Sequence, residues 1–242
     1  TLSVDAVYLN PIWDSRQNLG YGPLSYYKIS PNLGNDADLI SLGRTLHDNG
    51  MKLSLDAIFS YAMRDGIWCN QSGLYPLDGV YQAPDGMYKD MFTRTSAGGY
   101  ESVWGNLRVD FSSSVAKNLF YRGEDSVLLR YLGEPYNIDS WRFDAVASYY
   151  AGAQSTNDIS LEIRNSVKAK DKDTLLICEE NSKEYLSAGG WDTSYGIRGY
   201  FRRWFAGEYD QATFASNLKD YLCLPRTAAL CMLNQYDLHD ET

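Results

Sequence analysis

An alternation of short apolar runs with amphipathic segments is the feature that most constrains how this chain can fold. Residues 4–9 and 52–59 have the length and composition of buried strands, and residues 36–47 between them carry apolar side chains at helical spacing. Asn49 and Gly50 supply a stop signal for that helix. A strand, a helix and a strand in this order form a βαβ unit, which implies a parallel sheet.

The same alternation resumes in the second half of the chain. It predicts a helix over residues 114–132, a strand over 138–146, a helix over 159–169, a strand over 174–178, a weaker strand over 195–201, a helix over 211–222 and a strand over 228–233. We therefore predict an α/β protein with about six parallel strands. The alternation by itself leaves a barrel and an open doubly wound sheet as alternatives.

Residues 60–110 interrupt the alternation with a stretch rich in Gly, Tyr, Pro, Asp and Trp. A segment of this length inside a compact domain is usually a functional lid or a small subdomain. We therefore expect residues 1–59 and 111–242 to build one α/β domain and residues 60–110 to form a small insertion.

Charge and composition argue against several classes of function. The net charge of −9 argues against a nucleic-acid partner, because phosphate backbones are bound by basic surfaces. No apolar run approaches the ~20 residues needed to span a bilayer. Two histidines, and four cysteines without a CxxC pair, signal no metal site, and we expect no cofactor. Twenty tyrosines and six tryptophans, many in loop-like stretches, suit sugar ligands, although packing under loops accounts for most of them.

The chain begins on an apolar run without a charged leader and ends just after a polar cluster, so we expect a piece of a longer protein. Extracellular and cytoplasmic locations are equally open. The triplet Asn70-Gln71-Ser72 has the form of a glycosylation acceptor, a pattern that also occurs often by chance.

Two charged residues lie inside the apolar run at 138–146. Arg142 and Asp144 are two residues apart, so in a strand their side chains project from the same face. A neighbouring cation favours the ionised form of an acid, and we expect Arg142 to keep Asp144 negative. An anionic carboxylate at the end of a strand is a candidate nucleophile. The alternative is an ion pair that only ties the strand to a helix.

Glu179 directly follows the apolar run 174–178, so we expect partial burial to raise the pKa of its carboxyl. An acid that keeps its proton beside an acid that stays ionised is the pair used by retaining glycoside hydrolases, whose two carboxyl groups lie roughly 5–5.5 Å apart. The alternative for Glu179 is a strand-end charge turned into solvent. Asp56, and Asp237 or Asp240, also stand where predicted strands end.

Several motifs in order resemble the α-amylase family, glycoside hydrolase family 13. They are Val7-Tyr8-Leu9-Asn10-Pro11-Ile12, Gly20-Tyr21 with Tyr26-Tyr27 and Gly34, His47-Asp48-Asn49-Gly50 with Leu53-Ser54-Leu55-Asp56, Trp141-Arg142-Phe143-Asp144-Ala145, and Ile177-Cys178-Glu179. The stretch Gly99-Tyr100-Glu101-Ser102-Val103-Trp104-Gly105 resembles the insertion of the neopullulanase and cyclomaltodextrinase branch. By contrast, residues 144–148 and Glu179-Glu180 are similar to glycogen-branching enzymes.

The resemblance runs from the second to the seventh barrel strand of that family. It implies an incomplete (β/α)8 TIM barrel with a short excursion, a B-domain-like insertion at 60–110, after the third barrel strand. It also implies a retaining hydrolase that acts on α-glucosidic bonds of starch, glycogen, pullulan or maltooligosaccharides. The alternatives are a transglycosylase such as a branching enzyme, and a family member that has lost catalysis and only binds glycan or a protein partner.

The resemblance also implies roles for individual residues. Asp144 would be the nucleophile, Glu179 the acid, and Asp237 or Asp240 the third carboxylate. Substrate-binding roles would fall to Arg142, Tyr21, Tyr61, Trp104 and His239, while Asp56 would be the structural acid beneath the site. For Asp56 we favour the alternative, a carboxylate that is satisfied by backbone or Arg. For Trp104, core packing is an equal alternative.

The chain departs from the family at the end of the third strand. Ser60-Tyr61 replaces an Asn-His pair, and that Asn often helps to bind calcium, so we expect no metal site. Tyr61 is expected to replace the hydrogen bond of the missing His, but not its charge.

Overall fold

A computed structural model describes residues 4–180, 186, 189–195, 198–222 and 232–233 of the chain. Six strands form one parallel sheet in the order β1-β4-β8-β9-β10-β11. Their bounds are Ala6–Tyr8 for β1, Lys52–Ala57 for β4, Ser140–Phe143 for β8, Leu175–Cys178 for β9, Thr193–Tyr195 for β10 and Met232–Leu233 for β11. This confirms the predicted α/β class with a parallel sheet.

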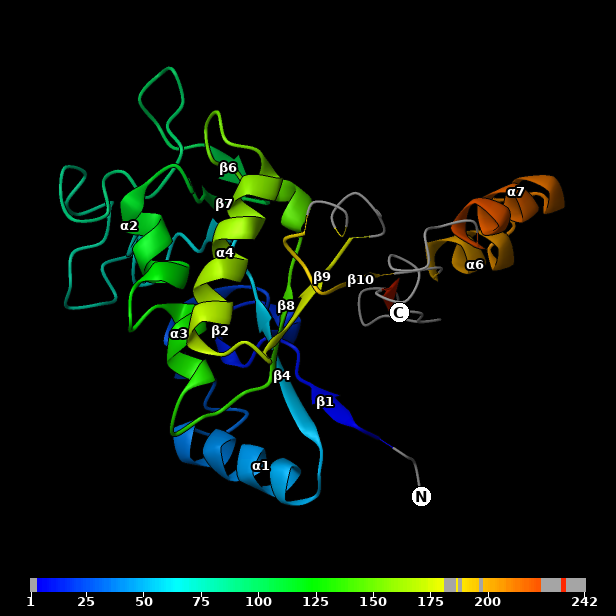
Figure 1. Cartoon of the computed structure of the whole chain (residues 1–242). Coiled ribbons are helices and arrows are strands. Elements are labelled where there is room, and N and C mark those ends of the chain that lie inside the picture. Colours follow the sequence, from blue (N-terminus) through cyan, green and yellow to red (C-terminus); the bar gives the residue numbers. More distant parts are fainter. Residues whose placement is uncertain (1–3, 181–185, 187–188, 196–197, 223–231, 234–242) are drawn as a thin grey trace.

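The order of the strands distinguishes between the two predicted architectures. Each strand is added beside the one that precedes it in the sheet, without the reversal of direction that marks a doubly wound sheet. Continuous addition on one side is the arrangement of a barrel wall. Over the described residues the wall is open, which agrees with an incomplete barrel (Figure 1).

Both crossover helices open with a capping box, and the second begins at Thr156, three residues before the predicted start at 159. Helix α1 (Asp36–Asp48) connects β1 to β4 and opens with a capping box, in which the Asn35 side chain accepts from the Ala37 amide at 2.9 Å and Asp38 accepts from the Asn35 amide at 2.9 Å. Helix α4 (Thr156–Lys170) connects β8 to β9 and has a capping box of its own. Such caps satisfy amides that the first helical turn leaves without partners.

The prediction of one helix over residues 114–132 was wrong. The segment contains α2 (Ser114–Lys117), a π-helical turn (Asn118–Arg122) and α3 (Val127–Leu132). The break lies at Gly123, whose backbone is extended, and the Ser126 hydroxyl then caps α3 by accepting from the Leu129 amide at 3.4 Å. All three pieces bury apolar side chains, Ala116 in α2, Phe120 and Tyr121 in the π-helical turn, and Val127 and Leu128 in α3.

The predicted strand over residues 195–201 was also wrong, because β10 ends at Tyr195 and helix α6 (Arg198–Phe205) follows. Phe201 and Phe205 are four residues apart, so their rings share one side of a helix, 6.2 Å apart. That side packs on Phe214 of α7 (Gln211–Leu222), a helix that the sequence predicted correctly. Of the predicted strand 228–233, the structure describes β11, whereas residues 223–231 lie outside the described part.

Two small antiparallel sheets accompany the parallel one. β2 (Trp13–Ser15) pairs with β3 (Pro23–Ile29), and β5 (Tyr61–Ala62), β7 (Asn106–Arg108) and β6 (Ser102–Val103) form a three-stranded sheet within the excursion. The excursion shares its core with the main sheet, since the Trp68 ring lies 5.6 Å from Tyr26 and 5.0 Å from Phe120. Among the described helices, none is long and apolar enough to cross a membrane.

Candidate active site

The carboxyl ends of β8 and β9 place Asp144 and Glu179 on neighbouring strands. The Asp144 amide donates to the Ala57 carbonyl at 3.0 Å, and the Glu179 amide donates to the Phe143 carbonyl at 3.1 Å. The ladder of the sheet therefore extends one residue beyond each strand. Because these bonds fix the backbone under both carboxylates, their side chains start from a rigid edge.

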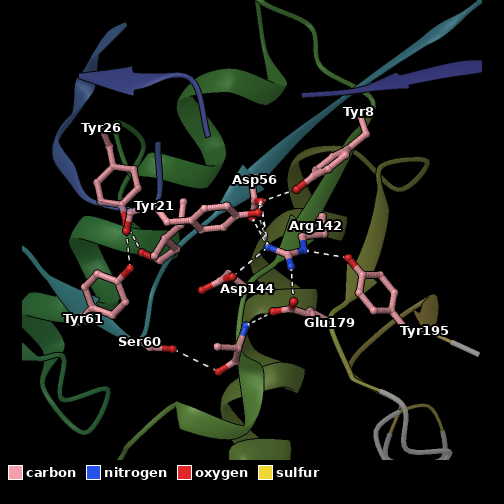
Figure 2. Close-up of polar contacts among 12 residues, drawn as sticks. Tyr8, Tyr21, Tyr26, Asp56, Ser60, Tyr61, Arg142, Asp144, Glu179 and Tyr195 are labelled. Atoms are coloured by element: carbon pink, nitrogen blue, oxygen red, sulfur yellow. Dashed lines mark hydrogen bonds and ion pairs between the residues drawn. The ribbon is translucent and has the colours of Figure 1, made fainter. Parts of the chain in front are cut away.

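Both carboxylates converge on the buried guanidinium of Arg142 (Figure 2). Its Nη1 donates to Asp144 Oδ1 at 3.0 Å and to Asp56 Oδ2 at 2.9 Å, and its Nη2 pairs with Glu179 Oε1 at 2.5 Å. Its Nε donates to the Tyr195 hydroxyl at 3.1 Å. The expected side-by-side position of Arg142 and Asp144 is confirmed. A simple tie between a strand and a helix does not describe this group, because its three carboxylates all stand at or just beyond the carboxyl end of a strand.

The charge balance of this group decides the protonation of Asp144. Burial raises the pKa of the Asp144 carboxyl to about 8; Arg142 opposes the rise, and the carboxylates of Asp56 and Glu179 add to it. The expectation that Arg142 would keep Asp144 ionised was therefore wrong. One guanidinium is shared among three carboxylates, so its attraction does not offset burial plus the repulsion of two like charges.

Asp56 lies at the bottom of the group and is 1% exposed. Burial raises the pKa of its carboxyl, while Arg142 and the hydroxyl groups of Tyr8 and Tyr21 oppose the rise. The Tyr8 hydroxyl donates to Asp56 Oδ2, and the Tyr21 hydroxyl donates to the same oxygen at 2.9 Å. These contacts confirm the expectation of an acid satisfied by Arg.

Gly20 positions Tyr21 over the guanidinium. At φ +85°, Gly20 adopts a left-handed conformation, and a Cβ atom there would lie 2.1 Å from the Pro11 carbonyl oxygen. Only glycine fits this turn. The turn brings the Tyr21 ring centroid to 5.8 Å from the Arg142 guanidinium, and Nη1 of Arg142 donates to the Tyr21 hydroxyl at 3.3 Å.

Tyr61 and Trp104 form an aromatic pair beside this group, with ring centroids 5.7 Å apart. The Tyr61 hydroxyl donates its proton to the Tyr21 carbonyl, so it can offer a ligand an acceptor but not a donor. Trp104 is 64% exposed, so core packing does not account for it.

Two residues of the group were missed by sequence reasoning. Tyr8 lies in the first strand just before Asn10 and Pro11, and its place beside the strand-end acids was a usable signal. Tyr195 was missed because the fifth strand was predicted to begin at the residue where β10 in fact ends. Three of the predicted site residues, Asp237, His239 and Asp240, lie outside the described residues.

No group of three or more His, Cys, Asp or Glu side chains within the described residues could hold a metal ion. A cavity of about 620 Å³ opens elsewhere, between the loop that follows β1 and helix α1, and Pro11, Trp13, Leu33 and Leu39 are among its lining residues. None of the carboxylates around Arg142 lines it.

Comparisons with known proteins bear on the family of the chain. The family model described as alpha amylase, catalytic domain, matches residues 1–165. Amylopullulanase of Thermoanaerobacterium thermosulfurigenes is 29% identical in an alignment of 197 positions that covers 74% of this chain and 10% of the relative. Neopullulanase 2 of Thermoactinomyces vulgaris is 27% identical in an alignment of 258 positions that covers 99% of this chain and 40% of the relative.

Solved structures show the same fold at low sequence identity. The ligand-free cyclic alpha-maltosyl-(1→6)-maltose hydrolase of Arthrobacter globiformis has a TM-score of 0.76 and 20% identity, over 96% of this chain and 52% of that chain. A cyclomaltodextrinase has a TM-score of 0.72 and 21% identity, over 97% of this chain and 40% of that chain. The chain thus spans only part of the relatives it matches. Because the family model covers more than half of the chain, the chain belongs to the alpha-amylase family.

Proposed function

We propose that this chain is the catalytic part of a retaining glycoside hydrolase that cleaves α-glucosidic bonds in starch, glycogen, pullulan or maltooligosaccharides. The observation that carries the proposal is the convergence of Asp144 and Glu179 on one guanidinium. Their side chains are 14% and 21% exposed, so a ligand can reach them, whereas that of Arg142 is 2% exposed and lies beneath. The names of the relatives, amylopullulanase and neopullulanase among them, support an α-glucan substrate.

In the proposed mechanism Asp144 is the nucleophile and Glu179 is first the acid and then the base. A carboxylate oxygen of Asp144 bonds to the anomeric carbon while the glycosidic C–O bond breaks, and Glu179 transfers its proton to the departing oxygen. A water molecule then gives a proton to Glu179 and attacks the same carbon, which releases the Asp144 carboxylate. Each of the two displacements inverts the anomeric carbon, so the product has the configuration of the substrate.

The two proposed acids differ in their surroundings. Glu179 Oε1 pairs with Arg142 and Oε2 accepts from the Ala145 amide at 2.8 Å, and these contacts fix the orientation of the carboxyl group. Because the pKa of Asp144 is raised to about 8, its reactive ionised form gains population as the pH rises. Arg142 orients both groups through Nη1 and Nη2.

Other residues are proposed to bind the sugar. Tyr21 and the exposed Trp104 offer ring faces, on which the C–H surface of a pyranose can pack, and the hydroxyl oxygen of Tyr61 can accept from a sugar hydroxyl. Asp237 or Asp240 is proposed as the third carboxylate, with His239 beside the substrate. Residues 60–110, which carry Tyr61 and Trp104, are proposed as the B-domain-like insertion on a partial barrel formed by residues 1–59 and 111–242.

The replacement Asp144→Asn tests the catalytic assignment. We expect release of reducing ends from amylose, pullulan and maltohexaose to fall roughly 10³-fold or more, because the amide is a poor nucleophile. For the wild-type protein, proton NMR should show that the sugar first released is the α-anomer. Asp173→Asn is a matched control, because Asp173 is 78% exposed and pairs only with Lys172 among the contacts described. Full activity of Asp144→Asn, or a β-anomeric first product, contradicts the proposal.

The products separate the proposed hydrolase from its alternatives. Shortened chains from amylose indicate hydrolysis, whereas new branch points indicate transfer to a sugar acceptor. Binding of glucan without any turnover by the wild-type chain indicates a member of the family that has lost catalysis.

A further inference from the structure

Two consecutive carboxylates hold the backbone turn that directly follows Asp144. Ala145 has φ 44° and ψ 48°, a left-handed conformation that residues with a side chain rarely adopt. Residues Val146–Ser148 then form a 3-10 turn, which the Ser148 amide closes by donating to the Ala145 carbonyl at 2.8 Å. An unfavourable conformation beside the proposed nucleophile persists only where its surroundings hold it.

Three side chains from other segments supply that support. The Ala145 amide donates to Glu179 Oε2 at 2.8 Å, and the Ala147 amide donates to Glu180 Oε1 at 3.1 Å. The Ser60 hydroxyl donates to the Ala145 carbonyl at 3.2 Å. Glu179 and Ser60 therefore hold the turn at Ala145, and Glu180 holds it at Ala147.

The bond made by Glu179 cannot stay constant during the proposed reaction. When Glu179 carries a proton for the departing oxygen, that carboxyl is neutral and accepts less strongly from the Ala145 amide. Glu180 takes no part in the proton transfer, so its bond to Ala147 can persist through both steps. Its own backbone is anchored to the next strand, because the Ser194 hydroxyl of β10 donates to the Glu180 carbonyl.

We propose that Glu180 is a positioning residue, which keeps the turn after Asp144, and hence the nucleophile, in place while Glu179 gives up and regains its proton. This inference rests on the proposed function. It assigns Glu180 a role that is distinct from the acid and base role proposed for Glu179.

Kinetics of Glu180→Ala and Glu180→Gln on two substrates test the proposal. Maltohexaose needs a proton from Glu179 at its departing oxygen, whereas α-maltosyl fluoride releases fluoride without one. For Glu180→Ala we expect kcat to fall roughly 10- to 100-fold on both substrates with little change in KM, because the nucleophile is misplaced. Glu180→Gln should retain most of the wild-type kcat, since its amide oxygen can accept the same hydrogen bond.

Three results overturn the proposal. Wild-type kcat for Glu180→Ala on both substrates means that the turn needs no support from Glu180. A loss confined to maltohexaose means that Glu180 acts on the acid Glu179 and not on the position of Asp144. An equal loss in Glu180→Gln and Glu180→Ala, together with a lowered thermal midpoint in both, means that Glu180 only stabilises the fold.

Hydrogen exchange gives a readout that does not depend on activity. The amides of residues 144–149 should exchange faster in Glu180→Ala than in the wild type, and at the wild-type rate in Glu180→Gln. If the wild-type chain cleaves neither substrate, the proposed function fails while this measurement still tests the role of Glu180 in the turn. Unchanged exchange in Glu180→Ala contradicts that role.

Discussion

Replacing Asp144 by Asn should make the protein more stable at neutral and mildly alkaline pH, although it removes the proposed nucleophile. The carboxyl of Asp144 is buried beside two other carboxylates, and its pKa is raised from 3.8 to about 8. Asn is neutral at every pH and nearly isosteric with Asp. Its amide oxygen can still accept from Arg142 Nη1, so the substitution removes the unfavourable charge and keeps the hydrogen bond.

The sign and size of the effect follow from proton linkage. Between pH 3.8 and about 8 the folded protein binds a proton at Asp144 that the unfolded chain does not bind, so the contribution of this group to stability falls as the pH rises through that window. Each unit of pKa difference corresponds to about 1.4 kcal/mol, so the raised pKa of Asp144 lowers the free energy of unfolding near neutral pH by at most roughly 4 kcal/mol. Below the ordinary pKa of Asp, Asp144 is protonated in both states, and the two proteins should be nearly equal in stability.

Urea unfolding followed by tryptophan fluorescence measures this difference across the pH range. Asp144→Asn should unfold at a higher urea concentration than the wild type near pH 8, and the gap should narrow steadily towards pH 4. The exposed Asp173→Asn should show little difference at any pH, because surface ion pairs contribute little to stability. Equal midpoints of wild type and Asp144→Asn at every pH would refute the reasoning that burial and shared charge raise this pKa.

The remaining predictions also concern carboxylates. Glu179→Gln should move the acidic limb of the pH profile on α-maltosyl fluoride to lower pH, because the Glu179 carboxylate helps to raise the pKa of Asp144; an unmoved limb contradicts this. At the other end of the sheet, burial would raise the pKa of Asp139, but hydrogen bonds from Lys52 and His47 help to hold it below its ordinary value. Its contribution to stability is therefore present above the ordinary pKa and lost in acid, so Asp139→Asn should lower the urea midpoint at neutral pH and have less effect in acid. If the urea midpoint of Asp139→Asn is lowered by the same amount at every pH, packing and not charge is responsible.

Some elements are readable from the sequence because their signals are local. Helix α7 begins and ends where periodicity places it, and strands β1, β4, β8 and β9 appear as apolar runs. The pair Arg142 and Asp144 also follows from spacing alone, since alternate residues of a strand share a face. Side chains at neighbouring strand ends meet in a parallel sheet, so Glu179 could be predicted beside them.

Other features depend on contacts between distant segments, which no local pattern contains. Asn70 begins a triplet of the form of a glycosylation acceptor, but it is 1% exposed and its amide donates to the carbonyls of Tyr75 and Leu77 at 3.1 and 3.0 Å. The triplet alone does not report this burial. The same holds for Tyr195, whose bond to Arg142 crosses two strand positions of the sheet.

The sequence by itself determined the class of fold and the acids that stand at the ends of the strands, because periodicity and spacing are properties of neighbouring residues. Its motifs, by their resemblance, indicated the family. Only the tertiary structure decided how those acids share charge. It brought Asp56, Asp144 and Glu179 to a single buried Arg142 and so raised the pKa of Asp144, where adjacency in the sequence predicted the opposite. Protonation follows the total charge and burial around a group, and these are set by residues that only folding brings together.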